Sequence, residues 1–480
     1  MYADTIAAIA TPPGEGGIGT VRLSGPQAAQ ILARLFVPAS GKLGPPASIR
    51  SHRLMFGYIH DPHTGERVDE VLAVLMRAPH SYTREDVVEI DCHGGTVPLQ
   101  RVLGLCLREG SRLARPGEFT LRAFLNGRLD LAQAEAVLDV VRARSAEGLR
   151  LAVEQLGGGL SGRVRGVRSK LLHALAHLEA TIDFPEDDVP PADVSPQLRD
   201  ALANIEALIA GADTGIVLRQ GVRTALVGRP NVGKSSLLNA LLRTERAIVT
   251  PIPGTTRDTL EEVANVRGVP LVLTDTAGLR GHHDTEDPIE VIGMERTRRA
   301  LAEADLVVMV FDGSQPLMPA DVAIVDEVKR RGPPMRLAVI NKSDLPRAFD
   351  PVQLGQALRD GEDREDGSGA RRTEIEIVEA SATQPGGTDR LEQKLAEIVL
   401  SGKVVPAPGE AVVTNVRHLD ALRRARRHLE EAIASGEAGM PAAFVAVDLH
   451  SALNALGEIT GETVGEDLLD EIFRNFCIGK

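Results

Sequence analysis

The chain has few of the features that build disulfide frameworks, zinc sites or membrane spans. Its 480 residues include three cysteines, Cys92, Cys106 and Cys477, and no Cys-x-x-Cys pair. Isolated thiols in odd number argue against a disulfide framework or a cysteine zinc site and fit a reducing compartment. No apolar run approaches membrane-spanning length, and the first residues carry Asp4 in place of the basic start of a signal peptide. We therefore expect a cytoplasmic protein without a membrane partner.

Positive charge is also in short supply. Lysine and arginine number 54 against 67 aspartates and glutamates, a net charge of −13. This balance argues against a protein that coats nucleic acid non-specifically, although it leaves room for a local basic patch or a basic partner protein. The length is sufficient for three domains, each with its own core.

Five short motifs in the middle of the chain follow the order found in guanine-nucleotide switches. They are Gly-Arg-Pro-Asn-Val-Gly-Lys-Ser at 228–235, Gly-Thr-Thr-Arg-Asp at 254–258, Asp-Thr-Ala-Gly at 275–278, Asn-Lys-Ser-Asp at 341–344 and Ser-Ala at 381–382. A single phosphate-binding loop would be an ambiguous signal. The complete ordered set predicts a GTP-binding domain.

The first motif lies between an expected strand, Val222 to Val227, and an expected helix, Ser235 to Leu242. Its glycines allow a tight turn in which backbone N–H groups and the helix N-terminus meet the phosphates. Lys234 is expected to reach the β- and γ-phosphates and to act in catalysis, and the Ser235 hydroxyl is expected to bind Mg²⁺.

The later motifs complete the nucleotide site. Thr256 is the expected second hydroxyl on Mg²⁺, and Asp275, at the end of the expected strand Pro270 to Thr274, suits a water on that ion. Asp344 can accept two hydrogen bonds from guanine that adenine does not offer, which selects GTP. The residues expected to contact GTP are Asn231, Val232, Gly233, Lys234, Ser235, Ser236, Thr250, Thr255, Thr256, Asp275, Thr276, Ala277, Gly278, Asn341, Lys342, Asp344, Ser381 and Ala382.

One residue that many small GTPases use for hydrolysis is missing. The glutamine that orients water after Asp-x-x-Gly is replaced by Leu279, which neither donates nor accepts a hydrogen bond. Asn231 offers a carbonyl oxygen to a monovalent cation beside the phosphates, or it caps the loop. The polar candidates that follow are Arg280, Glu286, Asp287, Glu290 and Glu295, each of which could equally be a solvated surface charge.

The rest of the chain suggests an interrupted helical domain. Residues 1–120 alternate apolar runs with turns, as in an α+β domain. Helical periodicity fills 167–182 and 198–209, before the GTPase motifs, and returns at 419–433 and 449–473 after them. We predict domains at 1–120, 121–215, 216–400 and 401–480, the second and fourth forming one helical domain. Gly361 to Arg372 is expected to be a mobile surface loop.

Three motifs outside the GTPase region carry less chemistry. The glycine-dense segment 10–19 is unlike an ordinary strand, so it brings backbone close to another group, in a structural turn or at a ligand. Pro116 to Phe119 allows the same two interpretations. Cys477, in the terminal Phe-Cys-Ile-Gly-Lys, is either a buried thiol or a reactive or ligand-facing one.

Several motifs resemble the bacterial tRNA-modification GTPase family MnmE (TrmE). They are Ala-Thr-Pro-Pro-Gly at 10–14, Tyr-Thr-Arg-Glu-Asp at 82–86, Cys-His-Gly-Gly at 92–95, Arg-Pro-Gly-Glu-Phe-Thr at 115–120, Leu-Asp-Leu-Ala-Gln-Ala-Glu-Ala at 129–136 and the closing Cys-Ile-Gly-Lys. The resemblance spans the whole chain. It implies a multidomain α/β fold with an N-terminal α+β folate-binding domain that dimerises, a helical domain and an inserted Ras-like GTPase domain.

The resemblance also implies an activity and partners. Such proteins form homodimers and work with the FAD-dependent MnmG, as a heterotetramer, on the wobble uridine of tRNA. They install aminomethyl or carboxymethylaminomethyl groups with carbon from 5-formyl- or methylene-tetrahydrofolate. By position, the folate ligands would be Arg22, Glu89, Arg128 and Lys480. Position 128 is more often lysine in the family.

The family's potassium ion would fill the role that Leu279 leaves open, as two GTPase domains meet. Its ligands map onto Asn231, Thr250, Ile252 and Thr255, and the catalytic acid onto Glu290, with Glu286 as the alternative because the preceding loop is about three residues longer than expected. Two rival interpretations are a ribosome-assembly GTPase, which would need a basic RNA-binding module after the switch, and a folate-dependent transferase that modifies tRNA without a flavin partner.

Overall fold

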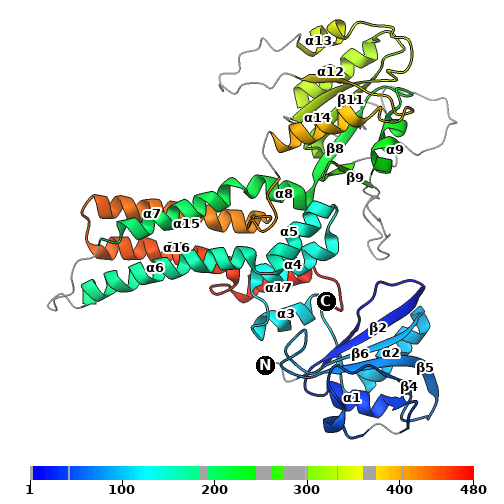
Figure 1. Cartoon of the computed structure of the whole chain (residues 1–480), viewed down its shortest axis with the longest axis vertical. Coiled ribbons are helices and arrows are strands. Elements are labelled where there is room, and N and C mark those ends of the chain that lie inside the picture. Colours follow the sequence, from blue (N-terminus) through cyan, green and yellow to red (C-terminus); the bar gives the residue numbers. More distant parts are fainter. Residues whose placement is uncertain are drawn as a thin grey trace.

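The computed structural model describes residues 4–41, 44–183, 193–244, 262–273, 298, 301–331, 333, 335–359, 375–401 and 405–480. They form an N-terminal sheet with two helices, a long helical bundle and a second sheet covered by helices on both faces (Figure 1). This is the multidomain α/β fold class that the sequence indicated.

The N-terminal sheet has seven strands in the order β3-β4-β5-β6-β2-β1-β7, mostly antiparallel. Its core is the set of apolar side chains between the sheet and helices α1 and α2, such as Leu32, Ile90 and Val102. The elements are β1 (Ile6–Ile9), β2 (Gly16–Ser24), α1 (Ala28–Leu35), β3 (Phe36–Pro38), a short 3₁₀ turn (Pro46–Ser48), β4 (Met55–His60), β5 (Arg67–Met76), β6 (Val87–Gly94), α2 (Thr96–Arg108) and β7 (Arg112–Leu113).

The glycine-dense segment proves to be partly a strand. Residues from Gly16 onward belong to β2 and pair with β6, with an irregularity between Gly16 and Ile18. A Cβ atom on Gly94 of β6 would lie 2.4 Å from the carbonyl oxygen of Gly16. The group that approaches this backbone is therefore the neighbouring strand, which supports the structural interpretation of these glycines.

The second sheet has six strands in the order β13-β12-β11-β8-β10-β9. All neighbours are parallel except β9 and β10, so the ends of β8, β11, β12 and β13 meet at one edge. The elements are β8 (Val222–Val227), α9 (Lys234–Thr244), β9 (Glu262–Val266), β10 (Val269–Leu273), β11 (Leu306–Asp312), α12 (Pro319–Arg331), β12 (Met335–Asn341), α13 (Pro351–Arg359), β13 (Glu376–Glu379) and α14 (Asp389–Leu400). The strand and helix predicted on either side of the phosphate loop are both present.

The helical bundle combines helices from both sides of this sheet in the sequence. Its core includes Leu171 of α6, Ile205 of α7, Leu422 of α15 and Leu449 of α16. The inserted architecture was therefore predicted correctly. The helices are α3 (Glu118–Leu125), α4 (Leu131–Arg142), α5 (Ala146–Leu156), α6 (Gly159–Asp183), α7 (Ser195–Ala210), α8 (Ala212–Gln220), α15 (Val416–Glu437), α16 (Ala442–Thr460) and α17 (Glu466–Arg474).

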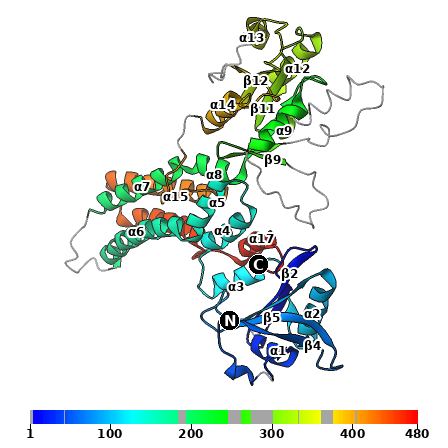
Figure 2. The ribbon, with the colours of Figure 1, turned by 45° about the vertical axis from the view of Figure 1, so that its right-hand side comes forward.

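The last helix returns to the N-terminal part of the chain. The periodic stretch 449–473 is two helices, because α16 ends at Gly461 in a left-handed conformation. Helix α17 then packs on α3, with Phe473 and Phe476 against Ala123 and Leu131. Both views place the C-terminus beside the N-terminal sheet (Figures 1 and 2).

One segment has the length and composition of a membrane span. Residues Ser195–Gln220, which comprise α7 and α8, form that candidate in the described part of the chain, and 39% of its most apolar window is buried. The sequence was expected to contain no apolar run of membrane-spanning length, and this segment meets that test by length and composition alone. Leu198, Ala201 and Ile205 of α7 lie in the bundle core, which accounts for its hydrophobicity.

A buried ion cluster joins α4 to α15. Both carboxylate oxygens of Glu135 accept hydrogen bonds from Arg417, and Oε2 also lies 2.7 Å from Nε2 of the fully buried His418. Burial alone would raise the pKa of Glu135, but His418 and Arg417 outweigh burial and lower that pKa to about 2 from the usual 4.5. The folded state therefore favours the ionised carboxylate.

Replacing Glu135 by glutamine should lower the free energy of unfolding by about 3 kcal/mol, because Arg417 and His418 lose their counter-charge in a buried site. The lowered pKa means that the wild-type advantage is complete above about pH 4.5 and disappears as the pH falls towards 2. Circular dichroism during urea unfolding at several pH values measures this gap. Glu66→Gln, in an exposed pair with Arg101, is the control and should have a much smaller effect. Equal effects of the two substitutions would contradict the assignment.

Candidate functional site

The phosphate loop connects β8 to α9 and keeps its glycine for a steric reason. Gly233 has a φ of 93°, and a Cβ atom there would lie 2.2 Å from Nδ2 of Asn341. Asn231 also has a positive φ, 62°, which asparagine tolerates better than most residues. Val232 belongs to the loop, and Ser235 and Ser236 lie in the first turn of α9. The loop is thus held against the segment that follows β12.

Lys234 lies folded over the loop that precedes it. Its Nζ donates to the carbonyl oxygens of Gly228 and Arg229, at 2.6 Å each. Burial lowers the pKa of Lys234 to about 8. Arg229 also pairs with the buried Asp321 of α12 at 2.7 Å. The loop is therefore anchored to α12, and the amine of Lys234 faces the loop backbone.

The residues expected to recognise guanine come together at the same edge of the sheet. Asn341 Nδ2 donates to Val232 O at 2.9 Å, and Lys342 Nζ donates to Asn231 O at 3.1 Å and to Asp312 at 2.6 Å. These contacts connect the Asn-Lys-Ser-Asp motif to the phosphate loop.

Asp344 is held by the motif after β13. Ser381 Oγ donates to its Oδ1 at 2.6 Å, and this hydrogen bond lowers the pKa of the carboxyl group. The carboxylate is therefore ionised and oriented at neutral pH, next to Ala382 and the loop in which Ser381 N donates to Gly387 O. An oriented acceptor of this kind suits the N–H groups of guanine.

Several predicted residues lie outside the described part of the chain. They are Thr250, Ile252, Thr255, Thr256, Asp275, Thr276, Ala277, Gly278, Leu279, Glu286 and Glu290, together with the Gly361 to Arg372 segment. Their expected roles remain predictions.

A second group of predicted residues gathers between the N-terminal sheet and the C-terminal tail. Arg22 of β2 binds Glu89 of the neighbouring strand β6 at 2.7 to 2.8 Å, and its Nη1 donates to Gly479 O at 3.2 Å. Lys480 is half-buried beside it, and burial together with the charge of Arg22 lowers the pKa of Lys480. Three of the four predicted folate ligands thus meet, although up to 457 positions separate the contacting residues in the sequence.

The fourth ligand, Arg128, belongs to the same cluster through an aromatic residue. The guanidinium carbon of Arg128 lies 4.7 Å from the ring centroid of Tyr82, and that of Arg22 lies 5.8 Å from the same centroid. The sequence analysis gave Tyr82 no role, and only its place in the Tyr-Thr-Arg-Glu-Asp motif marked it. Cys477 is exposed, and its carbonyl oxygen accepts from Gly117 N. The exposure excludes the interpretation of Cys477 as a buried thiol.

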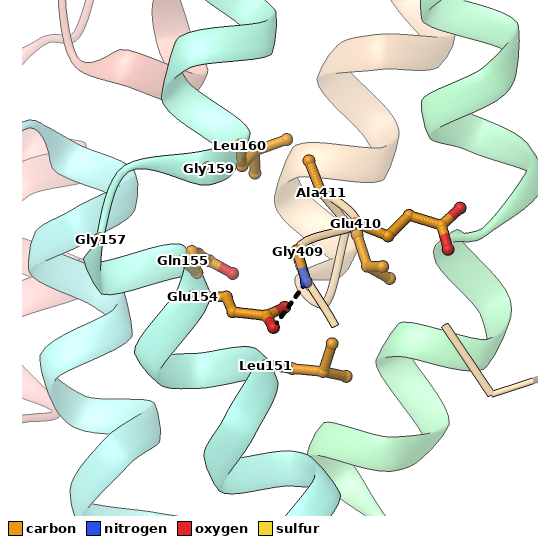
Figure 3. A pocket seen from close by; sticks show the side chains of 10 residues that line it. Leu151, Glu154, Gln155, Gly157, Gly159, Leu160, Gly409, Glu410 and Ala411 are labelled. Atoms are coloured by element: carbon orange, nitrogen blue, oxygen red, sulfur yellow. Dashed lines mark hydrogen bonds between the residues drawn. The ribbon is translucent and has the colours of Figure 1, made fainter. Parts of the chain in front are cut away.

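A pocket of about 190 Å³ lies where the chain returns from the GTPase sheet to the bundle. It lies between α5, the start of α6 and residues 409–412 (Figure 3). Gly409 N donates to Glu154 Oε1 at 3.0 Å, while Glu154 Oε2 is buried and accepts no hydrogen bond within the described structure. No predicted site residue lines this pocket, which lies at the junction between the helical bundle and the segment that returns from the GTPase sheet.

The mostly parallel sheet, the phosphate loop and the Asn341 and Asp344 side chains of one motif beside it define a P-loop protein that binds guanine nucleotides. Two family models match the chain: the GTP-binding protein TrmE N-terminus at residues 5–128 and the MnmE helical domain at residues 131–477. Their boundary falls between α3 and α4.

Curated relatives match over the full length. The tRNA modification GTPase MnmE of Chloroflexus aurantiacus is 53% identical over 477 residues, which cover 99% of this chain and 100% of the relative. Proteins of the same name from Roseiflexus castenholzii and Moorella thermoacetica are each 50% identical and are covered completely. The chain belongs to the MnmE family of tRNA modification GTPases. It is accordingly a GTP-hydrolysing enzyme.

Replacing Asp344 by asparagine should reduce the affinity for GTP by a factor of about 10 to 100, because a charged acceptor of two hydrogen bonds is lost. The asparagine amide can instead donate to the C2 carbonyl of xanthine, so xanthosine triphosphate should bind the variant more tightly than GTP does. Titration calorimetry with both nucleotides measures the change, and Asp326→Asn, on the exposed side of α12, is the control. Retention of the GTP preference would remove Asp344 from base recognition.

Proposed function

We propose that this chain couples GTP hydrolysis to modification of the wobble uridine of tRNA, in the cytoplasm and with an FAD-dependent partner. The observation that carries the proposal is the full-length match to proteins named tRNA modification GTPase MnmE, at 53% identity. The product is a 5-aminomethyl or 5-carboxymethylaminomethyl group on uridine. Hydrolysis drives a rearrangement of domains and is not itself the modification chemistry.

The Arg22, Glu89, Arg128 and Lys480 cluster supports the use of a folate. Tetrahydrofolate combines carboxylates, which need cations, with a pterin whose N–H groups need an acceptor. The cluster offers three cations and one carboxylate within a single half-buried site. The donor set therefore fits 5-formyl- or methylene-tetrahydrofolate, whose one-carbon unit supplies the added carbon. Exposed Cys477 adjoins this site.

The phosphate loop supports a nucleotide with Mg²⁺ and K⁺. Ser235 and Thr256 would hold Mg²⁺, and Asn231, Thr250, Ile252 and Thr255 would hold K⁺. The Asn231 side chain is exposed and caps nothing among the described residues, which favours the ion over the loop-capping role. A potassium ion held there would supply positive charge beside the phosphates. Glu290 is the proposed acid that orients water, with Glu286 as the alternative.

Assembly completes the proposal. Two copies of the chain form a homodimer through their N-terminal domains, and their GTPase domains meet during hydrolysis. Two copies of an MnmG-type flavoprotein join them in a heterotetramer that acts on tRNA. The ribosome-assembly alternative is less well supported, because residues 416–474 form the helices α15, α16 and α17 and no separate RNA-binding module.

The proposal predicts a defined loss in tRNA. A strain that lacks this chain should lose the 5-aminomethyl-type nucleosides at the wobble position, as measured by mass spectrometry of digested tRNA. A gene copy that encodes Lys234→Ala should fail to restore them, because the loop loses its phosphate contact, whereas the wild-type gene should restore them. An unchanged nucleoside profile in the deletion strain would refute the proposed function.

The potassium site predicts a cation dependence of GTP hydrolysis. Turnover should be more than about tenfold faster in K⁺ than in Na⁺ at equal ionic strength, because only an ion of the right size bridges the loop and the phosphates. Asn231→Gly tolerates the positive φ and should abolish the difference, and Asn231→Asp keeps an oxygen ligand and should retain it.

The catalytic acid is tested in the same assay. Glu290→Ala should lose turnover in both salts and keep its GTP affinity, and Glu286→Ala should retain turnover. The opposite pattern would assign the acid to Glu286. Equal rates of the wild-type protein in K⁺ and Na⁺ would exclude cation-assisted hydrolysis.

A further inference from the structure

The cluster between the N-terminal sheet and the C-terminal tail contains an aromatic residue with a defined geometric role. Besides the stacking at 4.7 Å, Nη1 of Arg128 donates to the backbone oxygen of Tyr82 at 3.3 Å. Arg128 is exposed and makes no ion pair within the described residues. The position of its guanidinium group therefore depends on Tyr82 alone among the contacts described here.

Tyr82 is itself held firmly. Its Oη forms a 2.9 Å hydrogen bond with Oγ1 of Thr120, and the ring packs beside Phe119. The next residue, Thr83, is fully buried and hydrogen-bonds Ser24 at 2.6 Å.

A buried ion pair holds the chain three residues after Tyr82. Glu85 accepts from Arg122, a side chain with no exposed surface, at 3.2 to 3.3 Å. The firmly held ring of Tyr82 thus stacks against the long, exposed side chain of Arg128. This arrangement reduces the conformational entropy that Arg128 loses when it binds an anion.

The charged residues of the cluster, Arg22, Glu89, Arg128 and Lys480, differ in whether another protein side chain neutralises their charge. Arg22 is paired with Glu89, so its charge is largely compensated within the protein. Arg128 keeps an uncompensated charge at the exposed end of the cluster. The anionic groups of a tetrahydrofolate are the α- and γ-carboxylates of its glutamate, at the end of the molecule away from the pterin. Tetrahydropteroate lacks both and carries a single carboxylate on its benzoyl ring. The free guanidinium group therefore suits the glutamate end.

We propose that Tyr82 is a positioning residue that holds Arg128 in place for the glutamate carboxylates of the folate. This inference rests on the proposed folate site and adds to it the end of the ligand that Arg128 binds. Stacking on an aromatic face leaves the planar N–H fork of arginine free for a bidentate contact.

The test compares two ligands and several variants of the full-length protein. Dissociation constants are measured by calorimetry for 5-formyl-tetrahydrofolate and for 5-formyl-tetrahydropteroate, which lacks the glutamate. Tyr82→Leu should weaken binding of the folate by about 5- to 10-fold and leave binding of the pteroate within about twofold. Tyr82→Phe keeps the ring and should bind both ligands as the wild type does.

A double-variant cycle shows whether Tyr82 acts through Arg128. Tyr82→Leu combined with Arg128→Ala should bind the folate no more weakly than Arg128→Ala alone. Tyr58→Leu is the matched control, because Arg67 stacks on that tyrosine at 3.8 Å on another strand of the sheet. This variant should bind both ligands normally. GTP hydrolysis and the thermal midpoint report whether each variant is folded.

The outcomes separate this inference from the proposed function. If the wild-type protein binds no folate, the proposed folate site fails. If the wild-type protein binds the folate and Tyr82→Leu weakens both ligands equally, Tyr82 contacts the pterin or supports the fold, and the positioning role is refuted. Additive effects in the double variant would refute it as well.

Discussion

The ion cluster at Glu135 is the interaction on which the architecture depends. It joins α4 to α15 across 282 positions of sequence, with the entire GTPase fold inserted between them. Arg417 also donates to Glu458 O of α16 at 2.7 Å, so three helices meet at the Arg417 side chain. Buried charges of this kind must meet a partner at a fixed distance and angle, so they specify which helices pair. A purely apolar interface specifies the pairing less strictly.

The nucleotide site and the cluster of Arg22, Glu89, Arg128 and Lys480 are both connected to helix α4. The GTPase sheet begins directly after α8, and Arg219 of α8 pairs with the buried Asp139 of α4 at 2.7 Å. Helix α4 in turn begins three residues after Arg128, with a capping box between Asp130 and Gln133. A continuous chain of helix and ion-pair contacts therefore links the base of the nucleotide fold to the cation cluster. The domain movement that we propose for hydrolysis could reach the cluster through these contacts.

The sequence predicted the elements that depend on local pattern and missed those that depend on distant partners. Apolar runs and ordered motifs identified β8, α9, the base-recognition motifs and the interrupted bundle, because each is encoded within a few residues. Helix α3 was missed because its start, Gly117-Glu118, looks like a turn. The buried carboxylate of Glu118 is satisfied there by Arg112, Arg122 and the backbone N–H of Arg115. The role of Tyr82 depends on Arg22 and Arg128, which lie far from it in the sequence. The resemblance of the chain ends to a family supplied the proposed folate residues, which no spacing rule would have selected.

The interrupted bundle has a consequence for how the protein is made. Helix α7 ends at Ala210 and α15 begins at Val416, so about 200 residues are synthesised before α6 and α7 can pack against α15 and α16. At bacterial elongation rates of roughly 5 to 20 residues per second, this interval lasts about 10 to 40 s. During that time Leu198, Ala201 and Ile205 of α7 lack the α15 and α16 side chains of their core, while the GTPase fold can already form. A newly made molecule can thus form its nucleotide-binding fold well before its helical bundle is complete.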